Sequence, residues 1–135
     1  MYSEINLKAG DTKVVQITVS LEDTALNYGS GQLEHLFATP KLVALMIEAS
    51  VKLIDPKLPA ELISVGKHVE VDHLAPTALS QIVTLEVKIT SLALPIIQLE
   101  MKAYDEIGLI GTGRHSRYIV NKRNLLEKAY ARIEP

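Results

Sequence analysis

Hydrophobic and polar residues alternate over Thr12–Ser20, with Val15, Ile17 and Val19 at every second position. A period of two predicts a β-strand with one buried face. The segment Leu21–Gln32 that follows contains the breaker sequence Gly-Ser-Gly. We therefore expect a loop or a short irregular helix after the first strand.

The strongest helix signal in the chain begins at Thr39-Pro40. A threonine can cap a helix with its hydroxyl, and proline suits the first helical position because its missing N–H would be unpaired there. Apolar residues then cover most of the helix circumference as far as Ile54. They leave one narrow polar stripe, which consists of Lys41, Glu48, Lys52 and Asp55. Such a helix is expected to be buried on most sides.

The rest of the chain is rich in Val, Ile and Thr, in segments that turn signals separate. These segments are Glu61–Leu74, Ser80–Leu92, Ile96–Asp105 and Leu109–Val120. Because they are long and closely joined, an antiparallel meander is the simplest topology. The tail, Asn121–Ile133, predicts a short amphipathic helix, since Leu125, Ala129 and Ile133 recur at intervals of four.

This order of elements predicts an α+β fold in which an antiparallel sheet wraps around a long central helix, since that helix is too apolar to face water. The length of 135 residues suits a single domain over residues 1–135. One sheet wrapped on one helix leaves an exposed sheet edge. Pairing two such edges would cover it, so we expect a homodimer, with a tetramer as the alternative.

Composition and charge exclude several classes of function. The chain has 14 Lys+Arg and 16 Asp+Glu and a net charge of −2, which predicts no nucleic-acid or membrane partner. It has no cysteine, which excludes disulfides, thiolate nucleophiles and cysteine-based metal sites. No secretory signal is readable, and no apolar run is long enough to span a membrane. A cytoplasmic location is therefore the default expectation.

Five short stretches of sequence resemble one known family in their order and mutual spacing. They are Tyr28-Gly29-Ser30-Gly31, Ala38-Thr39-Pro40, Gly66, Val71-Asp72-His73-Leu74-Ala75-Pro76 and Gly111-Thr112-Gly113-Arg114-His115-Ser116-Arg117. With the order of elements, they make the chain similar to the hotdog-fold acyl-CoA thioesterases that resemble fluoroacetyl-CoA thioesterase. The resemblance implies hydrolysis of a short or medium acyl-CoA to free acid and CoA, without metal or cofactor, at a site between the subunits of a homodimer.

The resemblance also assigns candidate site residues. It places catalysis on Thr39 and His73, and substrate binding on Gly66 and Arg117. The chemistry suits these residue types, because an imidazole with an ordinary pKa near 6.5 can move a proton at neutral pH. A helix start offers free N–H groups to a thioester carbonyl. For Arg117, a salt bridge between subunits is the competing interpretation.

The family's catalytic glutamate does not transfer cleanly to this chain. It lies eight residues after the threonine, which falls on Ile47, and Glu48 is one position late. One residue turns a helical side chain by about 100°. Glu48 is therefore catalytic only if a local bulge restores its direction, and otherwise it pairs with Lys52 on the polar stripe.

Two other functions follow from the same residues. Without a carboxylate, the chain would be a non-catalytic acyl-CoA or acyl-carrier binding module. Hydratase or dehydratase chemistry is less favoured, because Asp72 and His73 would lie on opposite faces of a strand.

We expect an acyl pocket formed by Leu33, Leu36, Phe37, Leu42 and Met46. In the family, a phenylalanine of the lid is expected where this chain has Leu33, which predicts a less selective pocket.

Overall fold

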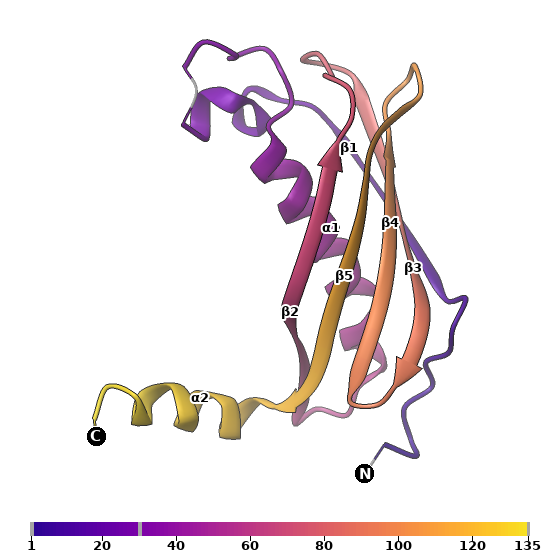
Figure 1. Ribbon diagram of the computed structural model, residues 1–135, viewed down its shortest axis with the longest axis vertical. Helices are drawn as coiled ribbons and strands as arrows, with labels where there is room; N and C mark the ends of the chain where they lie inside the picture. Colours follow the sequence, from indigo (N-terminus) through magenta and orange to yellow (C-terminus); the bar gives the residue numbers. More distant parts are fainter. Residues whose placement is uncertain (1, 30, 135) are drawn as a thin grey trace.

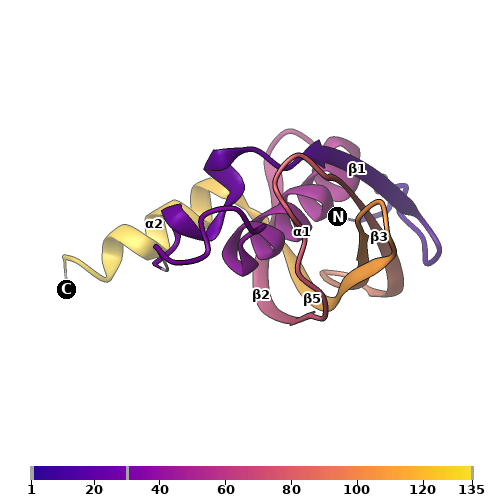
Figure 2. The same cartoon turned by 90° about the horizontal axis from the view of Figure 1, so that it is seen from above.

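The computed structural model describes residues 2–29 and 31–134, and it contains one five-stranded antiparallel sheet and two α-helices (Figure 1). The strands are β1 (Thr12–Thr18), β2 (Leu62–His73), β3 (Ile82–Ala93), β4 (Ile96–Tyr104) and β5 (Leu109–Asn121), and the helices are α1 (Thr39–Ile54) and α2 (Lys122–Ala131). Short 3-10 turns occupy Leu21–Asp23, Ala25–Asn27 and Asp55–Lys57. The sheet curls around α1 (Figure 2), which confirms the predicted hotdog fold.

The predicted meander is correct for β3, β4 and β5 and wrong for β2. The strand order is β1-β3-β4-β5-β2, so that β2 pairs with β5 at the edge of the sheet opposite β1. The reason is the connection between β1 and β2. It carries α1 across the sheet, where the helix contacts β1, β3 and β2, and this brings the chain to the far edge.

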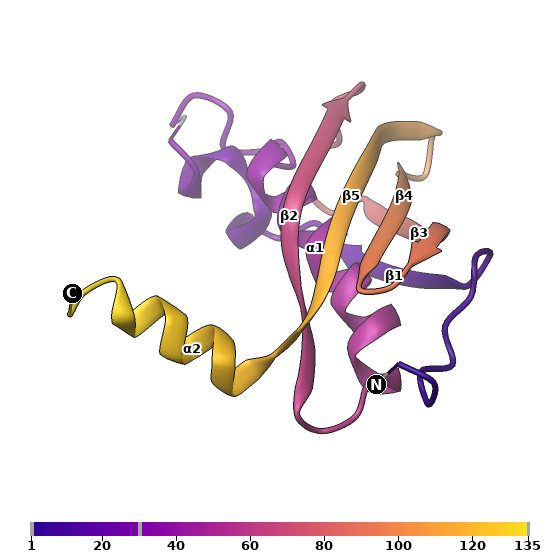
Figure 3. The same ribbon diagram turned by 60° about the horizontal axis from the view of Figure 1, so that its bottom comes forward.

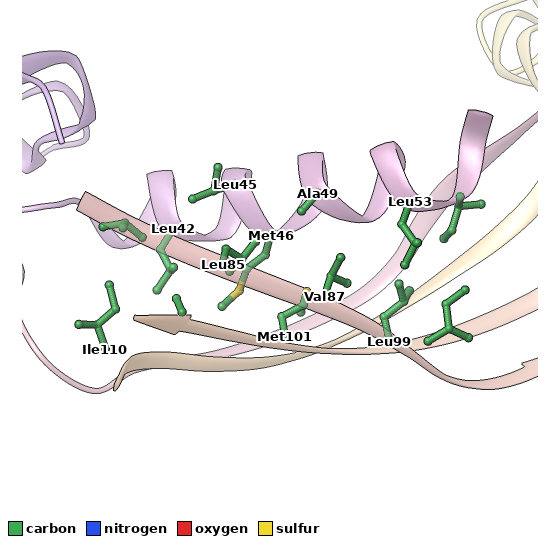
Figure 4. Packing of buried hydrophobic residues seen from close by; sticks show 14 of the residues in the cluster. Leu42, Leu45, Met46, Ala49, Leu53, Leu85, Val87, Leu99, Met101 and Ile110 are labelled. Atoms are coloured by element: carbon green, nitrogen blue, oxygen red, sulfur yellow. The ribbon is translucent and has the colours of Figure 1, made fainter. Parts of the chain in front are cut away.

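The core lies between α1 and the inner face of the sheet (Figure 4). The buried residues of α1 are Leu42, Leu45, Met46, Ala49, Ser50, Leu53 and Ile54. Two glycines of β5 let the helix approach closely. A Cβ at Gly111 would lie 2.9 Å from Cδ2 of Leu42, and one at Gly113 would lie 3.1 Å from Sδ of Met46. The glycines therefore fix the height of α1 above β5, and with it the position of the helix start.

One face of α1 is less covered than its sequence predicted. Glu48 and Lys52 of the polar stripe are exposed and form an ion pair at 3.2 Å, whereas Lys41 and Asp55 are half-buried. Val43, Ile47 and Val51, which recur at intervals of four, are only half-buried. Burial on most sides is therefore wrong for a single chain, because the sheet covers only the face of the helix that packs against it.

The β2 edge and the C-terminal helix lie on the same side of the molecule. Most residues of β2 are exposed or half-buried, and within the described residues only β5 pairs with it. From the end of β5, α2 runs out past β2 (Figure 3), and every one of its residues is exposed or half-buried. Neither α1 nor α2, the two α-helices of the described residues, is long and apolar enough to cross a membrane.

Candidate functional site

The first residue of α1 and the last residue of β2 meet through their side chains. Thr39 Oγ1 lies 2.6 Å from His73 Nδ1, which is hydrogen-bonding distance. The prediction that Thr39 caps the helix is wrong, because the N-cap residue is Ala38 and no side chain makes the capping hydrogen bond. The hydroxyl is therefore directed toward the imidazole instead of toward the helix backbone.

Backbone hydrogen bonds hold the segment before Thr39 in place. The N–H of Phe37 donates to the carbonyl of Thr77 at 2.8 Å, and the N–H of Ala38 donates to the carbonyl of Asp23 at 2.9 Å. Buried Asp23 also pairs with Lys41 at 3.5 Å, on the first turn of the helix. Segments from three parts of the chain thus fix where α1 begins.

The environment of His73 favours its neutral form. The imidazole is half-buried and lies edge-on to the ring of Phe37, with the ring centres 6.2 Å apart. Burial lowers the pKa of His73 below its usual 6.5. Its Nε2 is buried and has no hydrogen-bond partner within the described residues. At neutral pH the ring can therefore accept a proton.

A cleft of about 310 Å³ opens beside this pair. It is lined by Ala25, Leu33, Leu36, Phe37, Ala38, Thr39, His73, Leu74, Ala75 and Pro76. None of these residues carries a carboxylate, an ammonium or a guanidinium, so the cleft suits an uncharged apolar group. Three of the five residues expected in the acyl pocket line it, whereas Leu42 and Met46 belong to the core. Of the stretch Tyr28-Gly29-Ser30-Gly31, Ser30 lies outside the described residues.

Neither candidate for the catalytic glutamate position lines the cleft. Glu48 has an exposed side chain, 54%, and its carboxylate contacts Lys52. Ile47 is half-buried and apolar. The α1 helix is continuous over Thr39–Ile54, and the structure does not bring Glu48 to the pair formed by Thr39 and His73.

Gly66 and Arg117 lie together, away from the residues that line the cleft. They are paired across β2 and β5, and Arg117 is only 4% exposed. The guanidinium donates from Nε to Ser64 Oγ and from Nη2 to the Ser64 carbonyl, both at 2.8 Å. A Cβ at Gly66 would lie 3.2 Å from Cε1 of His115. Within one chain, the absence of a side chain at Gly66 leaves space for the buried side chains of this network.

His115 is a member of this network to which the family resemblance assigns no role. Its Nδ1 donates to the carbonyl of His68 at 2.7 Å, so its Nε2 accepts from Nη1 of Arg117 at 3.1 Å. Burial lowers the pKa of His115, which agrees with a neutral ring beside a cation. Asp55 completes the network by accepting from the Ser64 hydroxyl. The shared strand face of His115 and Arg117 was the only sequence signal for this cluster.

The chain matches the model of the family described as fluoroacetyl-CoA-specific thioesterase over residues 19–123. Among solved structures, a hot-dog-like protein from Thermanaerovibrio acidaminovorans is 31% identical, with a TM-score of 0.89, covering 97% of this chain and 96% of its own. A hypothetical protein from Thermus thermophilus, a thioesterase superfamily member, is 26% identical, with a TM-score of 0.83 and coverages of 94% and 93%.

A third solved structure shows a ligand. It is a variant of the fluoroacetyl-CoA thioesterase FlK in complex with acetyl-CoA. It is 23% identical to this chain, with a TM-score of 0.87, and the match covers 93% of this chain and 98% of that one. No curated protein matches the chain.

Proposed function

Because the chain belongs to the fluoroacetyl-CoA-specific thioesterase family, we propose that it hydrolyses the thioester of a short or medium acyl-CoA to the free acid and CoA. The observation that carries this proposal is the 2.6 Å contact between Thr39 Oγ1 and His73 Nδ1 at the wall of an apolar cleft. A hydroxyl beside a neutral imidazole is the arrangement that nucleophilic and general-base catalysis use.

In the proposed mechanism, Thr39 attacks the thioester and His73 handles the proton. As Thr39 Oγ1 bonds to the carbonyl carbon, Nδ1 of His73 takes the hydroxyl proton. The C–S bond then breaks, the proton passes to the leaving sulfur, and CoA departs as its thiol. A water molecule then attacks the acyl-threonine while His73 takes one of its protons. The bond between the acyl carbon and Thr39 Oγ1 breaks, the proton returns to Oγ1, and the free acid leaves. The chain's own groups, substrate and water balance every step, so the proposal includes no metal and no cofactor.

The start of α1 would stabilise the charge that develops on the carbonyl oxygen. The first turn of a helix presents N–H groups without partners and the positive end of the helix dipole. Thr39 is the first residue of that turn. When the carbonyl carbon of the thioester lies within reach of Thr39 Oγ1, its oxygen lies near these N–H groups. Their hydrogen bonds to the oxygen strengthen as negative charge develops on it in the transition state.

The cleft favours an uncharged acyl group larger than a two-carbon unit. Its volume is about 310 Å³ and its wall is apolar, with Leu33 at the position where the resemblance leads us to expect a phenylalanine of the lid. We therefore propose no selectivity for fluoroacetyl-CoA over acetyl-CoA. A higher kcat/KM for butyryl-CoA and hexanoyl-CoA than for either two-carbon substrate would support this assignment.

We further propose that the active form is a homodimer paired along β2. Within the described residues, the outer edge of β2 faces no other strand, and an unpaired edge favours pairing with another chain. Exposed Gly66 lies on β2 itself and buried Arg117 pairs with it from β5, and this position at the edge fits a role in supporting the interface or the substrate of the neighbouring copy. We propose no tetramer.

The test is release of free CoA thiol from a panel of acyl-CoA substrates of increasing chain length. We expect turnover by the wild type, and a loss of roughly a hundredfold or more in kcat for His73→Ala. Thr39→Ala should lose a similar amount, while Thr39→Ser should retain activity because it keeps a hydroxyl. Equal rates for the wild type and His73→Ala on every substrate would contradict the proposal.

A second candidate function is an acyl-CoA or acyl-carrier binding module without catalysis. The observation in its favour is apolar Ile47 at the position of the family's glutamate, with Glu48 exposed and paired to Lys52. In this proposal the cleft binds the acyl group and Thr39 orients it. Calorimetry that detects acyl-CoA binding, together with no thiol release by the same preparation, would favour the binding module over the enzyme.

A further inference from the structure

The C-terminal helix presents an apolar face that its own chain leaves exposed. Along α2, Leu126 is 43% exposed and Tyr130 is 64% exposed, and Ile133 just beyond the helix is 76% exposed. At about 100° per residue these three side chains lie within roughly a quarter of the helix circumference. An apolar face of this kind on an otherwise charged helix is typical of a helix that packs against another surface.

The cleft has exposed apolar residues at its rim. Leu33 and Leu74 both line the cleft, yet they are 48% and 58% exposed. The segment between β1 and α1, residues 19–38, contains two exposed acidic residues, Glu22 and Glu34, and no lysine or arginine, while its third acidic residue, Asp23, is buried and paired with Lys41. By contrast, the side of α2 that carries Leu126 also carries the basic residues Lys122 and Arg123, whereas Lys128 lies on the opposite side of the helix. The two surfaces are therefore complementary in both apolar character and charge.

Pairing along β2 brings these two surfaces together. The helix α2 begins beside the Leu62 end of β2, where the N–H of Lys122 donates to the carbonyl of Glu61 at 3.1 Å. The cleft lies at the opposite end of β2, at His73. Two antiparallel β2 strands related by a two-fold axis place the His73 end of one beside the Leu62 end of the other.

The direction of α2 fits this placement. Figures 1 and 3 show α2 extending beyond β2, on the same side as the segment between β1 and α1. Figure 2, seen from above, shows α2 and that segment overlapping in projection, while Figure 1 shows them near opposite ends of the long axis. A helix of 10 residues reaches about 15 Å. This is far enough to cross the shared edge and reach the neighbouring copy.

We propose that α2 of a second copy packs its apolar face over the rim of the Thr39–His73 cleft and forms the wall that one chain leaves open. The occupant of the exposed face of α2 is thus another copy of this chain, and each cleft of the dimer is completed by its neighbour. The inference rests on the proposed homodimer, but it requires neither the thioesterase activity nor any substrate.

Cysteine cross-linking tests the placement, because the natural chain contains no cysteine. The variant Leu74→Cys/Tyr130→Cys puts one thiol at the cleft rim and one on the apolar face of α2. The matched control, Leu74→Cys/Lys128→Cys, places the second thiol about 200° away on the same helix. We expect a short bismaleimide to join two chains severalfold faster in the first variant than in the control, as read on a denaturing gel.

Sedimentation of both variants before cross-linking separates the possible failures. Equal cross-linking rates in protein that sediments as a dimer would overturn the placement of α2 and leave the homodimer intact. Protein with the mass of one chain at every concentration would overturn both the homodimer and this inference. Efficient cross-linking of a protein without thiol-releasing activity would support the inference while contradicting the proposed function.

A second measurement separates contact from a general loss of stability. If α2 forms a wall of the neighbouring cleft, Tyr130→Ala should raise the KM for acyl-CoA severalfold and leave kcat nearly unchanged, because it removes binding that is uniform between substrate and transition state. Lys128→Ala is the matched control and should change neither value. A fall in kcat with an unchanged KM would contradict a role for Tyr130 in the wall.

Discussion

A threonine hydroxyl commonly caps a helix from the N-cap position, immediately before the first helical residue. Here Thr39 is one residue inside the helix and contacts His73 instead, at 2.6 Å. The helix gains no side-chain cap from it, and a cap of this kind is typically worth about 1 kcal/mol. A hydroxyl that does not cap the helix and contacts an imidazole at the wall of a cleft favours a chemical function for the pair.

The acidity of His73 predicts the pH dependence of hydrolysis. Burial lowers the pKa of His73 below 6.5, and only the neutral ring can accept a proton. As pH rises through this lowered pKa, the neutral fraction increases, so kcat/KM should rise with pH below 6.5 and level off above it. The kcat/KM for thiol release, measured as a function of pH, gives this rising part, the acid limb, of the profile.

A matched control for that profile is His35→Ala. The side chain of His35 is 69% exposed, and it does not line the cleft, so the variant should keep the same acid limb as the wild type. A profile whose acid limb has its midpoint above pH 6.5 would contradict the assignment of His73 as the base.

The exposed ion pair of Glu48 predicts that its carboxylate is dispensable. Glu48→Gln removes the charge but keeps the shape, and the contact with Lys52 that it loses is worth only about 0.3–0.5 kcal/mol. We expect kcat and KM within twofold of the wild type and little change in the unfolding free energy. Steady-state kinetics beside His73→Ala checks this, and a comparable loss of kcat in the two variants would restore Glu48 as a catalytic residue.

At the scale of elements, two glycines of β5 determine how α1 sits on the sheet. A Cβ at Gly113 would lie 3.1 Å from Sδ of Met46 on α1, and also 2.8 Å from Cε of Met101 on β4 and 3.0 Å from the carbonyl oxygen of Glu70 on β2. Gly113→Ala should therefore lower the free energy of unfolding by about 1–3 kcal/mol, which is typical of an overpacked core. Urea denaturation measures the change.

Gly108→Ala serves as the comparison for this substitution. No atom lies within 4 Å of a Cβ built at Gly108, and its backbone does not have a positive φ. Its unfolding free energy should stay within about 0.5 kcal/mol of the wild type, as for most exposed positions. Equal losses in both variants would show that close packing of α1 on β5 is not what Gly113 provides.

The sequence predicted the elements better than their arrangement. Alternation and helical periodicity are local, so β1, α1 and α2 were each found within two or three residues of their observed ends. The partner of β2 was not predicted, because pairing with β5 joins residues far apart in the chain. The pairing of β2 with β5 is determined by α1, which crosses the sheet between β1 and β2.

The candidate site shows the same contrast between local and distant information. The motifs around Thr39 and His73 pointed to these two residues, and the structure places them in hydrogen-bond contact. The network of Asp55, Ser64 and His115 with Arg117 was not foreseen. Its members come from α1's end, β2 and β5, and no short sequence pattern encodes a hydrogen bond between them.

At the scale of the whole molecule, the exposed side of the sheet predicts the behaviour of the protein in solution. Val69 lies near the middle of β2, pairs with His115 and is 37% exposed although it is apolar. Val69 therefore adds apolar surface to the unpaired backbone of the β2 edge, and the half-buried stripe of α1 and the exposed face of α2 leave further apolar surface uncovered. Association of two chains removes both from water.

We therefore expect sedimentation to give twice the chain's 14.8 kDa, and the thermal unfolding midpoint to rise with protein concentration, because association stabilises the folded chain by mass action. Val69→Lys should shift the protein toward the mass of one chain, since a charge at a sheet edge opposes pairing. Ile107→Lys makes the same chemical change at the tip of the β4–β5 hairpin, where the side chain is 87% exposed, and should leave the dimer intact. An unfolding midpoint independent of concentration, with Val69→Lys and Ile107→Lys indistinguishable, would mean that the β2 edge stays unpaired and that each cleft functions within a single chain.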